Sequence, residues 1–178
     1  FREAIPQMER VNDLAYLGSF QLEHLFQEEM NPKSVSKADR SFLYYNKGIA
    51  AYRTEDYANA SEFFSRIPQA STYFVKSRFY LGVVSVMLSK QTAAIKYFSD
   101  VRQYAQEDEP TLKELATLNI ARAYYETGKL IEAINFYSEI PRESENWLQA
   151  LFEASWAFFL LEKPNNCLGN IHTLHAPF

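Results

Sequence analysis

One pattern of two small residues and one bulky residue recurs along this chain, and its spacing constrains the fold more than any other feature. In each copy the second small residue lies 12 positions after the first small residue, and the bulky residue lies 16 positions after that same first residue. Successive copies are 34 residues apart, except for one step of 39 residues. The four copies are Gly48, Ala60, Phe64; Gly82, Ala94, Phe98; Ala121, Ala133, Tyr137; and Ser155, Cys167, Ile171. Equal steps of about 34 residues are typical of stacked helix–turn–helix units.

Composition agrees with a helical domain that has a real core. Of the 178 residues, 47% are hydrophobic and 22% are charged, which is unlike a disordered chain. Only five glycines and seven prolines are present, and this favours helices over turn-rich sheets. The net charge of −4 comes without a long basic run, so we expect no nucleic-acid partner. No apolar run is long enough to span a bilayer, so we expect no direct insertion into a membrane.

Apolar periodicity and breaker residues predict two regions. Residues 1–36 form an N-terminal helical segment, with a helix over about 2–29 that is either a cap or a partial repeat. Residues 37–178 form the repeat array. The helices expected in the array span 37–54, 57–66, 72–88, 92–105, 111–127, 130–139, 145–161 and 165–174.

A second motif, Ile-Pro-x-x-Ser, recurs at Ile67–Ser71 and at Ile140–Ser144. Proline should end the short helix before it, and the serine should cap the helix that follows. The five extra residues of the longer repeat step fall at 106–110. There we expect Pro110 in the first turn of a helix, where its missing N–H has no partner to lose.

These patterns resemble the tetratricopeptide repeat (TPR) over about residues 41–174. Small residues at the repeated positions would let the two helices of a unit approach closely, and the bulky residues would fill the layer between units. The resemblance implies an all-α fold: a right-handed α-solenoid of about four TPR-like helix–turn–helix units plus the N-terminal helical segment. The matching residues are Tyr44, Gly48, Tyr57, Ala60, Phe64; Leu81, Gly82, Ala94, Phe98; Ile120, Ala121, Tyr124, Gly128, Ala133, Tyr137; and Ala154, Ser155, Phe158, Cys167, Ile171.

In this family the first helix of each unit lines a concave groove that binds a protein or peptide. The exposed stripe of that helix, which also takes in Phe42 and Leu118, is rich in aromatic and aliphatic residues. The resemblance therefore implies a hydrophobic partner, with Asn119 and Arg122 fixing its register through hydrogen bonds. The candidate partner-binding residues are Tyr45, Ile49, Tyr52, Phe79, Val83, Asn119, Arg122, Tyr125, Phe152, Trp156 and Phe159.

One further interpretation of the stripe, core packing, stays open. Apolar stripes commonly pack into a core, and neighbouring repeats or the chain's own N-terminal helix would then cover these residues. The chaperone-binding branch of the family holds a peptide carboxylate with Lys and Asn in the stripe. Tyr45, Ile49, Phe79 and Val83 occupy those places here, so we do not expect chaperone tails as partners.

Chemistry-bearing motifs are sparse, so we predict a non-catalytic scaffold with no cofactor. Cys167, His172 and His175 can be drawn as C-x4-H-x2-H, but zinc usually takes four ligands, or three around an open position. We therefore predict no metal site. The alternatives are a structural spacer whose groove is filled by the rest of its own chain, and a regulatory repeat domain of a larger enzyme.

The compartment and the extent of the array follow only from weaker signals. The Ile-Pro-x-x-Ser motif and the aromatic richness resemble repeat proteins of bacterial cell envelopes, with the cytoplasm as the alternative location. A chain that starts at Phe1 reads as a piece of a longer protein. Leu168, Ile171 and Leu174 would leave an apolar end, so we expect the array to continue beyond Phe178.

Overall fold

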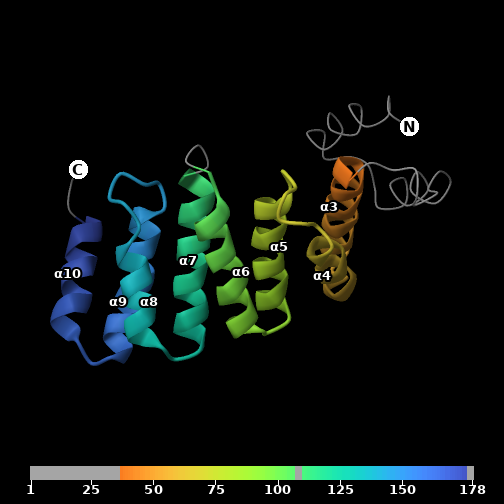
Figure 1. Ribbon diagram of the computed structural model, residues 1–178. Coiled ribbons are helices and arrows are strands. Elements are labelled where there is room, and N and C mark those ends of the chain that lie inside the picture. Colours follow the sequence, from red (N-terminus) through yellow and green to blue (C-terminus); the bar gives the residue numbers. More distant parts are fainter. Residues whose placement is uncertain (1–36, 107–109, 176–178) are drawn as a thin grey trace. The chain divides into compact units, whose positions relative to one another are not determined.

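The computed structural model describes residues 37–106 and 110–175, and over these residues the chain is all-helical (Figure 1). Every helix predicted for the array is present, with ends within two residues of the expected ones. The predicted helix over 2–29 and the boundary at 36 lie outside the described residues. The helices are α3 (Lys37–Arg53), α4 (Tyr57–Ser65), α5 (Phe74–Met87), α6 (Gln91–Tyr104), α7 (Pro110–Glu126), α8 (Leu130–Ser138), α9 (Trp147–Leu160) and α10 (Pro164–His175).

The turn inside each helix pair has the same geometry in all four repeats. The second residue after the first helix takes a positive φ, and the N–H of the residue that follows it donates to the carbonyl five positions back. In the second repeat this bond runs from Lys90 to Ser85 at 2.8 Å, and in the third from Lys129 to Tyr124 at 2.9 Å. This arrangement is a Schellman motif, which ends a helix and reverses the chain. The positive-φ residues are Glu55, Ser89, Gly128 and Glu162.

The two Ile-Pro-x-x-Ser motifs form matching turns before α5 and α9. In each, the serine N–H donates to the proline carbonyl at 3.0 Å. The hydroxyl oxygen of Ser71 accepts from the N–H of Tyr73, and that of Ser144 accepts from the N–H of Asn146. Proline therefore follows the end of the short helix, as predicted. The predicted side-chain cap is wrong, because each serine hydroxyl bonds an N–H that still precedes the helix.

The five extra residues of the longer repeat step lie in and after α6. This helix has 14 residues, whereas α4 and α8 have nine each and end before a proline. Without that proline, α6 continues for more than another turn. Helix α7 then begins at Pro110, as predicted for a residue without a backbone N–H.

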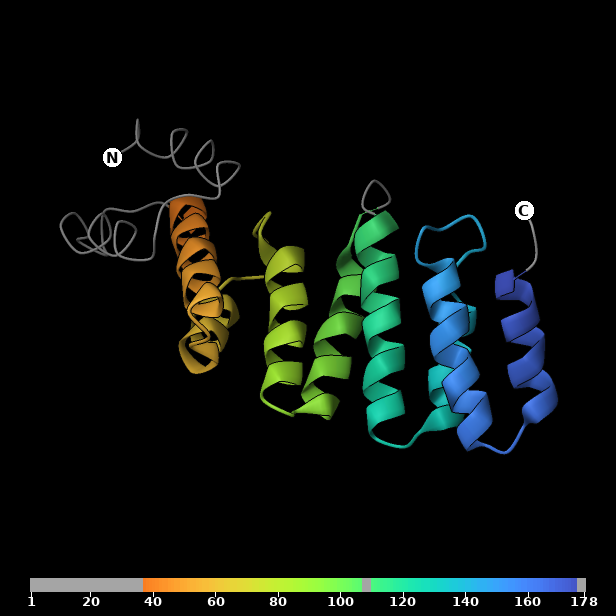
Figure 2. The ribbon, with the colours of Figure 1, turned by 180° about the vertical axis from the view of Figure 1, so that it is seen from behind.

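The described residues divide into two compact parts at the bond between Ser77 and Arg78, which lies within α5. In the second part each helix from α6 to α10 contacts the next one along the chain. Figures 1 and 2 show this succession from two sides.

Small residues bring the helices of a pair together, as the repeat pattern predicts. In the first part, a Cβ atom added to Gly48 would lie 2.5 Å from the ring of Phe64. In the second part, a Cβ added to Gly82 would lie equally close to Phe98. Both rings are fully buried, and so is Ala133 in the third repeat. The absence of a side chain at the glycines therefore creates the space that each phenylalanine fills.

Helix α10 differs from its counterparts in how well its apolar residues are covered. Ile171 is 37% exposed, although Phe98 and Tyr137 at the same repeat position are buried. Cys167, the counterpart of the buried Ala94 and Ala133, is also partly exposed. No described helix covers this face of α10 in the way that α7 packs on α6 and α9 packs on α8. None of the described helices is both long and apolar enough to cross a bilayer.

Candidate protein-binding surface

The predicted stripe residues of the first part are half-buried and packed against other rings. Tyr45 contacts Phe64 and Tyr73, with ring centroids 6.0 and 5.1 Å apart. Tyr52 contacts the ring of Tyr57 at 6.1 Å. Ile49 is half-buried as well. Much of the surface of these side chains is therefore already used for packing.

The two predicted residues on α5 have similar surroundings. The ring of Phe79 meets that of Phe98 edge-to-face at 5.5 Å, and Val83 is half-buried. Two other stripe members, Phe42 and Leu118, are buried, so their assignment to an exposed stripe is wrong. Leu118 belongs to a buried cluster with residues of α8 and α9, and helical spacing alone does not say which side of a stripe a neighbouring helix covers.

Three predicted residues on α9 form an exposed aromatic row. Phe152, Trp156 and Phe159 are 51%, 52% and 60% exposed. Their spacing of four and three residues places them on one helix face. Trp156 meets Phe152 at 6.3 Å and Phe159 at 6.2 Å, both edge-to-face. We call these three residues the α9 row.

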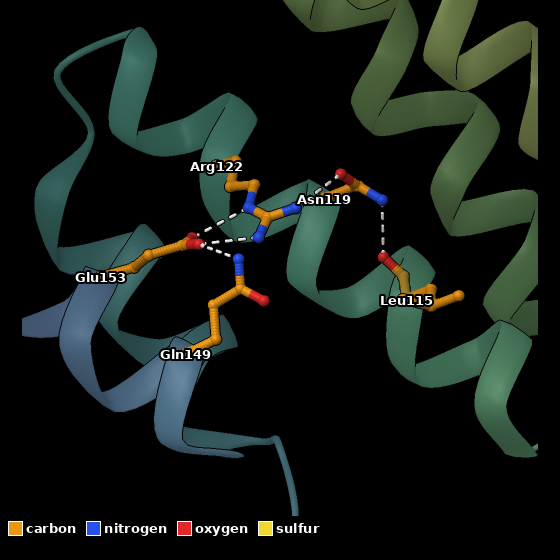
Figure 3. Close-up of polar contacts among 5 residues, drawn as sticks. All are labelled: Leu115, Asn119, Arg122, Gln149 and Glu153. Atoms are coloured by element: carbon orange, nitrogen blue, oxygen red, sulfur yellow. Dashed lines mark hydrogen bonds and ion pairs between the residues drawn. The ribbon is translucent and has the colours of Figure 1, made fainter. Parts of the chain in front are cut away.

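A two-pronged ion pair joins α7 to α9 beside this row (Figure 3). Arg122 donates from Nε to Glu153 Oε2 at 2.9 Å and from a terminal nitrogen to Oε1 at 2.7 Å. Gln149 donates to the same carboxylate at 3.1 Å. Asn119 accepts from Arg122 at 3.4 Å and donates to the carbonyl of Leu115 at 2.8 Å. Thus both side chains that were predicted to set the partner's register have partners within the chain.

Glu153 governs the electrostatics of this pair. Its hydrogen bonds raise the pKa of Arg122, which outweighs the opposing effect of partial burial. Tyr137 on α8 lies against the same carboxylate. Burial raises the pKa of Tyr137 well above its ordinary value of 10.0, and the negative charge of Glu153 adds to the rise. Tyr137 therefore stays a neutral hydroxyl that can donate to Glu153.

A pocket of about 330 Å³ opens between these groups. It draws on two successive repeats, with α7 and α8 from the third and α9 from the fourth. Its walls combine three aromatic rings with three charged groups. The lining residues are Arg122, Tyr125, Glu126, Tyr137, Glu153 and Trp156.

Three of the pocket residues, Glu126, Tyr137 and Glu153, were not among the predicted site residues. A comparison of repeat positions contains the signal that would have found them. Arg122 stands where the earlier repeats have Ile49 and Val83, and Tyr137 replaces two phenylalanines. Polar groups that enter two apolar positions of one repeat need partners in the fold. Glu153 supplies them.

Metal-ligating groups do not converge in the part of the chain that the structure describes. No three His, Cys, Asp or Glu side chains there are grouped so that they could hold a metal ion. Cys167 and His172 lie on α10, and the side chain of His175 is outside the described residues.

Comparisons with solved structures identify the architecture. The structure of MamA superimposes with a TM-score of 0.69 at 12% identity, over 88% of this chain and 84% of that one. YrrB, described as a TPR protein with an unusual peptide-binding site, gives a TM-score of 0.63 at 19% identity, over 75% of this chain and 66% of that one. The chain has the tetratricopeptide repeat fold. PilF of Pseudomonas aeruginosa gives 0.58 at 17% identity, over 75% and 59% of the two chains.

These similarities establish the fold, whereas the function has to be argued from the residues of this chain. No protein-family model matches the sequence, and no curated protein is significantly similar to it. The predicted all-α, TPR-like class is confirmed by the helices and by these neighbours. The predicted site residues stay a prediction.

Proposed function

We propose that this chain is a non-catalytic scaffold that holds a protein partner through the α9 row. The observation that carries the proposal is the exposure of three large aromatic side chains on one helix face. Leu148 and Leu160 on the same helix are exposed as well, which enlarges the apolar area. Contiguous exposed apolar surface of this kind is typical of interaction sites.

The partner we propose is a hydrophobic segment, either an amphipathic helix or an extended peptide. Trp and other large aromatic side chains are frequent anchors of interfaces, because they bury much area and lose little side-chain entropy. The row is preorganised, since the edge-to-face contacts at 6.2 and 6.3 Å already fix the rings relative to each other. Among proteins of the same fold, YrrB is described as having a peptide-binding site, which supports a peptide as ligand.

A random-peptide library panned on the chain tests this proposal. Replacing Phe152 and Phe159 with alanine together should weaken the captured peptides at least tenfold, because both rings would lose their contact with the ligand. The matched control is Ile131→Ala on α8, which removes a side chain as exposed as Phe159 but outside the row. Peptides that bind the double variant as tightly as the parent would refute the proposal, provided that circular dichroism shows unchanged helicity.

A further inference from the structure

We propose that the pocket beside Trp156 receives the side chain of an arginine or lysine of the partner, with its cationic head at Glu126. This inference rests on the proposed function, because it names the chemistry that the partner brings next to the α9 row. It adds one charged contact, a basic side chain of the partner, to a binding surface that is otherwise apolar.

The walls of the pocket suit the stem of a long basic side chain. Tyr125, Tyr137 and Trp156 contribute rings, and Trp156 is half exposed. A volume of about 330 Å³ is at the small end of ligand pockets and fits one side chain better than a longer segment. Lys and Arg commonly lay their methylene stems on apolar surface while the charge stays near water. A cation over the face of Trp or Tyr gains further attraction from the ring.

The charges of the lining favour a cation. Glu126, Glu153 and Arg122 sum to one negative charge at the pocket. Arg122 is held by two hydrogen bonds to Glu153, so these two charges largely cancel. Glu126 is exposed and, among the described side chains, it accepts a hydrogen bond from the neutral Gln91 and takes part in no ion pair. The uncompensated charge of the pocket is therefore the carboxylate of Glu126.

An acidic side chain of the partner is disfavoured for two reasons. It would have to displace Glu153 from Arg122, where the intramolecular bonds are 2.7 and 2.9 Å long. It would also approach Glu126, and like charges brought together oppose binding. The chain as a whole carries a net charge of −4, which adds a weaker preference for a basic partner.

The carboxylate at this position is specific to the third repeat. The counterparts of Glu126 in the other repeats are Arg53, Met87 and Leu160. Those residues provide no negative charge. The proposed site therefore belongs to one junction, between the third and fourth repeats, and sets the register of a bound partner along the array.

Three single-residue probes test the inference on the 178-residue chain by NMR. N-acetyl-arginine amide carries the charge, N-acetyl-citrulline amide is its neutral analogue of nearly the same shape, and N-acetyl-glutamate amide carries the opposite charge. The readout is the indole N–H signal of Trp156. We expect a saturable shift with the arginine probe, at least threefold weaker binding of the citrulline probe, and the weakest binding with the glutamate probe.

Variants assign the effect to Glu126. Glu126→Gln should weaken the arginine probe at least threefold while leaving the citrulline probe unchanged. The control Glu132→Gln removes the same charge from an exposed position on α8 outside the pocket lining and should leave the arginine probe unaffected.

The inference is overturned if no probe shifts the Trp156 signal, if citrulline binds as well as arginine, or if Glu126→Gln has no effect. The proposed function stands or falls separately. Library peptides that need Phe152 and Phe159 but carry no basic consensus, and that bind Glu126→Gln normally, would leave the scaffold proposal intact and remove only the basic anchor.

Discussion

Replacing Gly82 with alanine should destabilise the chain, whereas the same replacement at Gly169 should stabilise it. Both glycines lie within helices, α5 and α10, so both variants gain helix propensity. They differ in the space around the new methyl group. At Gly82 that group would lie 2.5 Å from Phe98 Cε1 and 2.7 Å from two further ring atoms, whereas at Gly169 nothing lies within 4 Å.

The magnitudes follow from these distances. Carbon atoms in good contact are about 3.5–4.0 Å apart, so the methyl at Gly82 overlaps the ring by about 1 Å. Phe98 is fully buried and cannot swing into solvent. Overpacking of a core costs about 1–3 kcal/mol, and an overlap with three atoms belongs at the upper end. After a propensity gain of about 1 kcal/mol, we expect Gly82→Ala to lose about 2 kcal/mol and Gly169→Ala to gain about 0.5–1 kcal/mol.

Urea unfolding followed by far-UV circular dichroism measures both changes. A double variant adds a sharper test, since Phe98→Leu should cost less stability in the Gly82→Ala background than in the parent, because it relieves the overlap. The reasoning is refuted if Gly82→Ala is as stable as the parent, or if both alanine variants shift the urea midpoint in the same direction.

Three further predictions concern the turns and the pocket. Ser89→Gly should stabilise the chain by about 0.5–1 kcal/mol, and Gly128→Ala should destabilise it by about 1 kcal/mol, because both positions have positive φ; urea midpoints test the pair. A double-mutant cycle of Arg122→Met and Glu153→Gln should give a coupling of about 1 kcal/mol that shrinks with added salt, and a coupling of zero would contradict a stabilising pair. The folded state raises the pKa of Tyr137, so its neutral hydroxyl contributes to folding stability in full below pH 10. Above pH 10 this contribution to stability is lost progressively, because Tyr137 ionises first in the unfolded chain. Tyr137→Phe should therefore lose less stability than the parent between about pH 10 and pH 11 in urea titrations, and equal losses would contradict the assignment.

The sequence alone predicted the architecture well, because the architecture depends on local and periodic features. The helix ends follow from turn residues and prolines that act within a few positions. The repeated small residues also predicted the close approach at Gly48 and Gly82, since only a missing side chain admits a buried ring there.

The site was predicted less completely, because it depends on which residues of neighbouring repeats meet. A stripe drawn at helical spacing could not separate Phe152, which is exposed, from Phe42, which is buried. Glu153 gave no signal by itself, since an acidic residue on a helix is ordinarily solvated. Only its interactions with Arg122 and Tyr137, which lie 31 and 16 residues earlier in the sequence, show its role.

Residues of two successive repeats line the pocket, so ligand binding depends on α9 staying packed against α7 and α8. In repeat proteins each repeat contacts only its neighbours, so one repeat can open locally while the others stay folded. If α9 opens in this way, Glu153 and Trp156 leave the pocket while Tyr125 and Glu126 remain on α7. A bound ligand must then oppose this opening by mass action. Slower amide exchange in α9 and α10 would accordingly report occupancy of the pocket, even for a ligand that never touches α10.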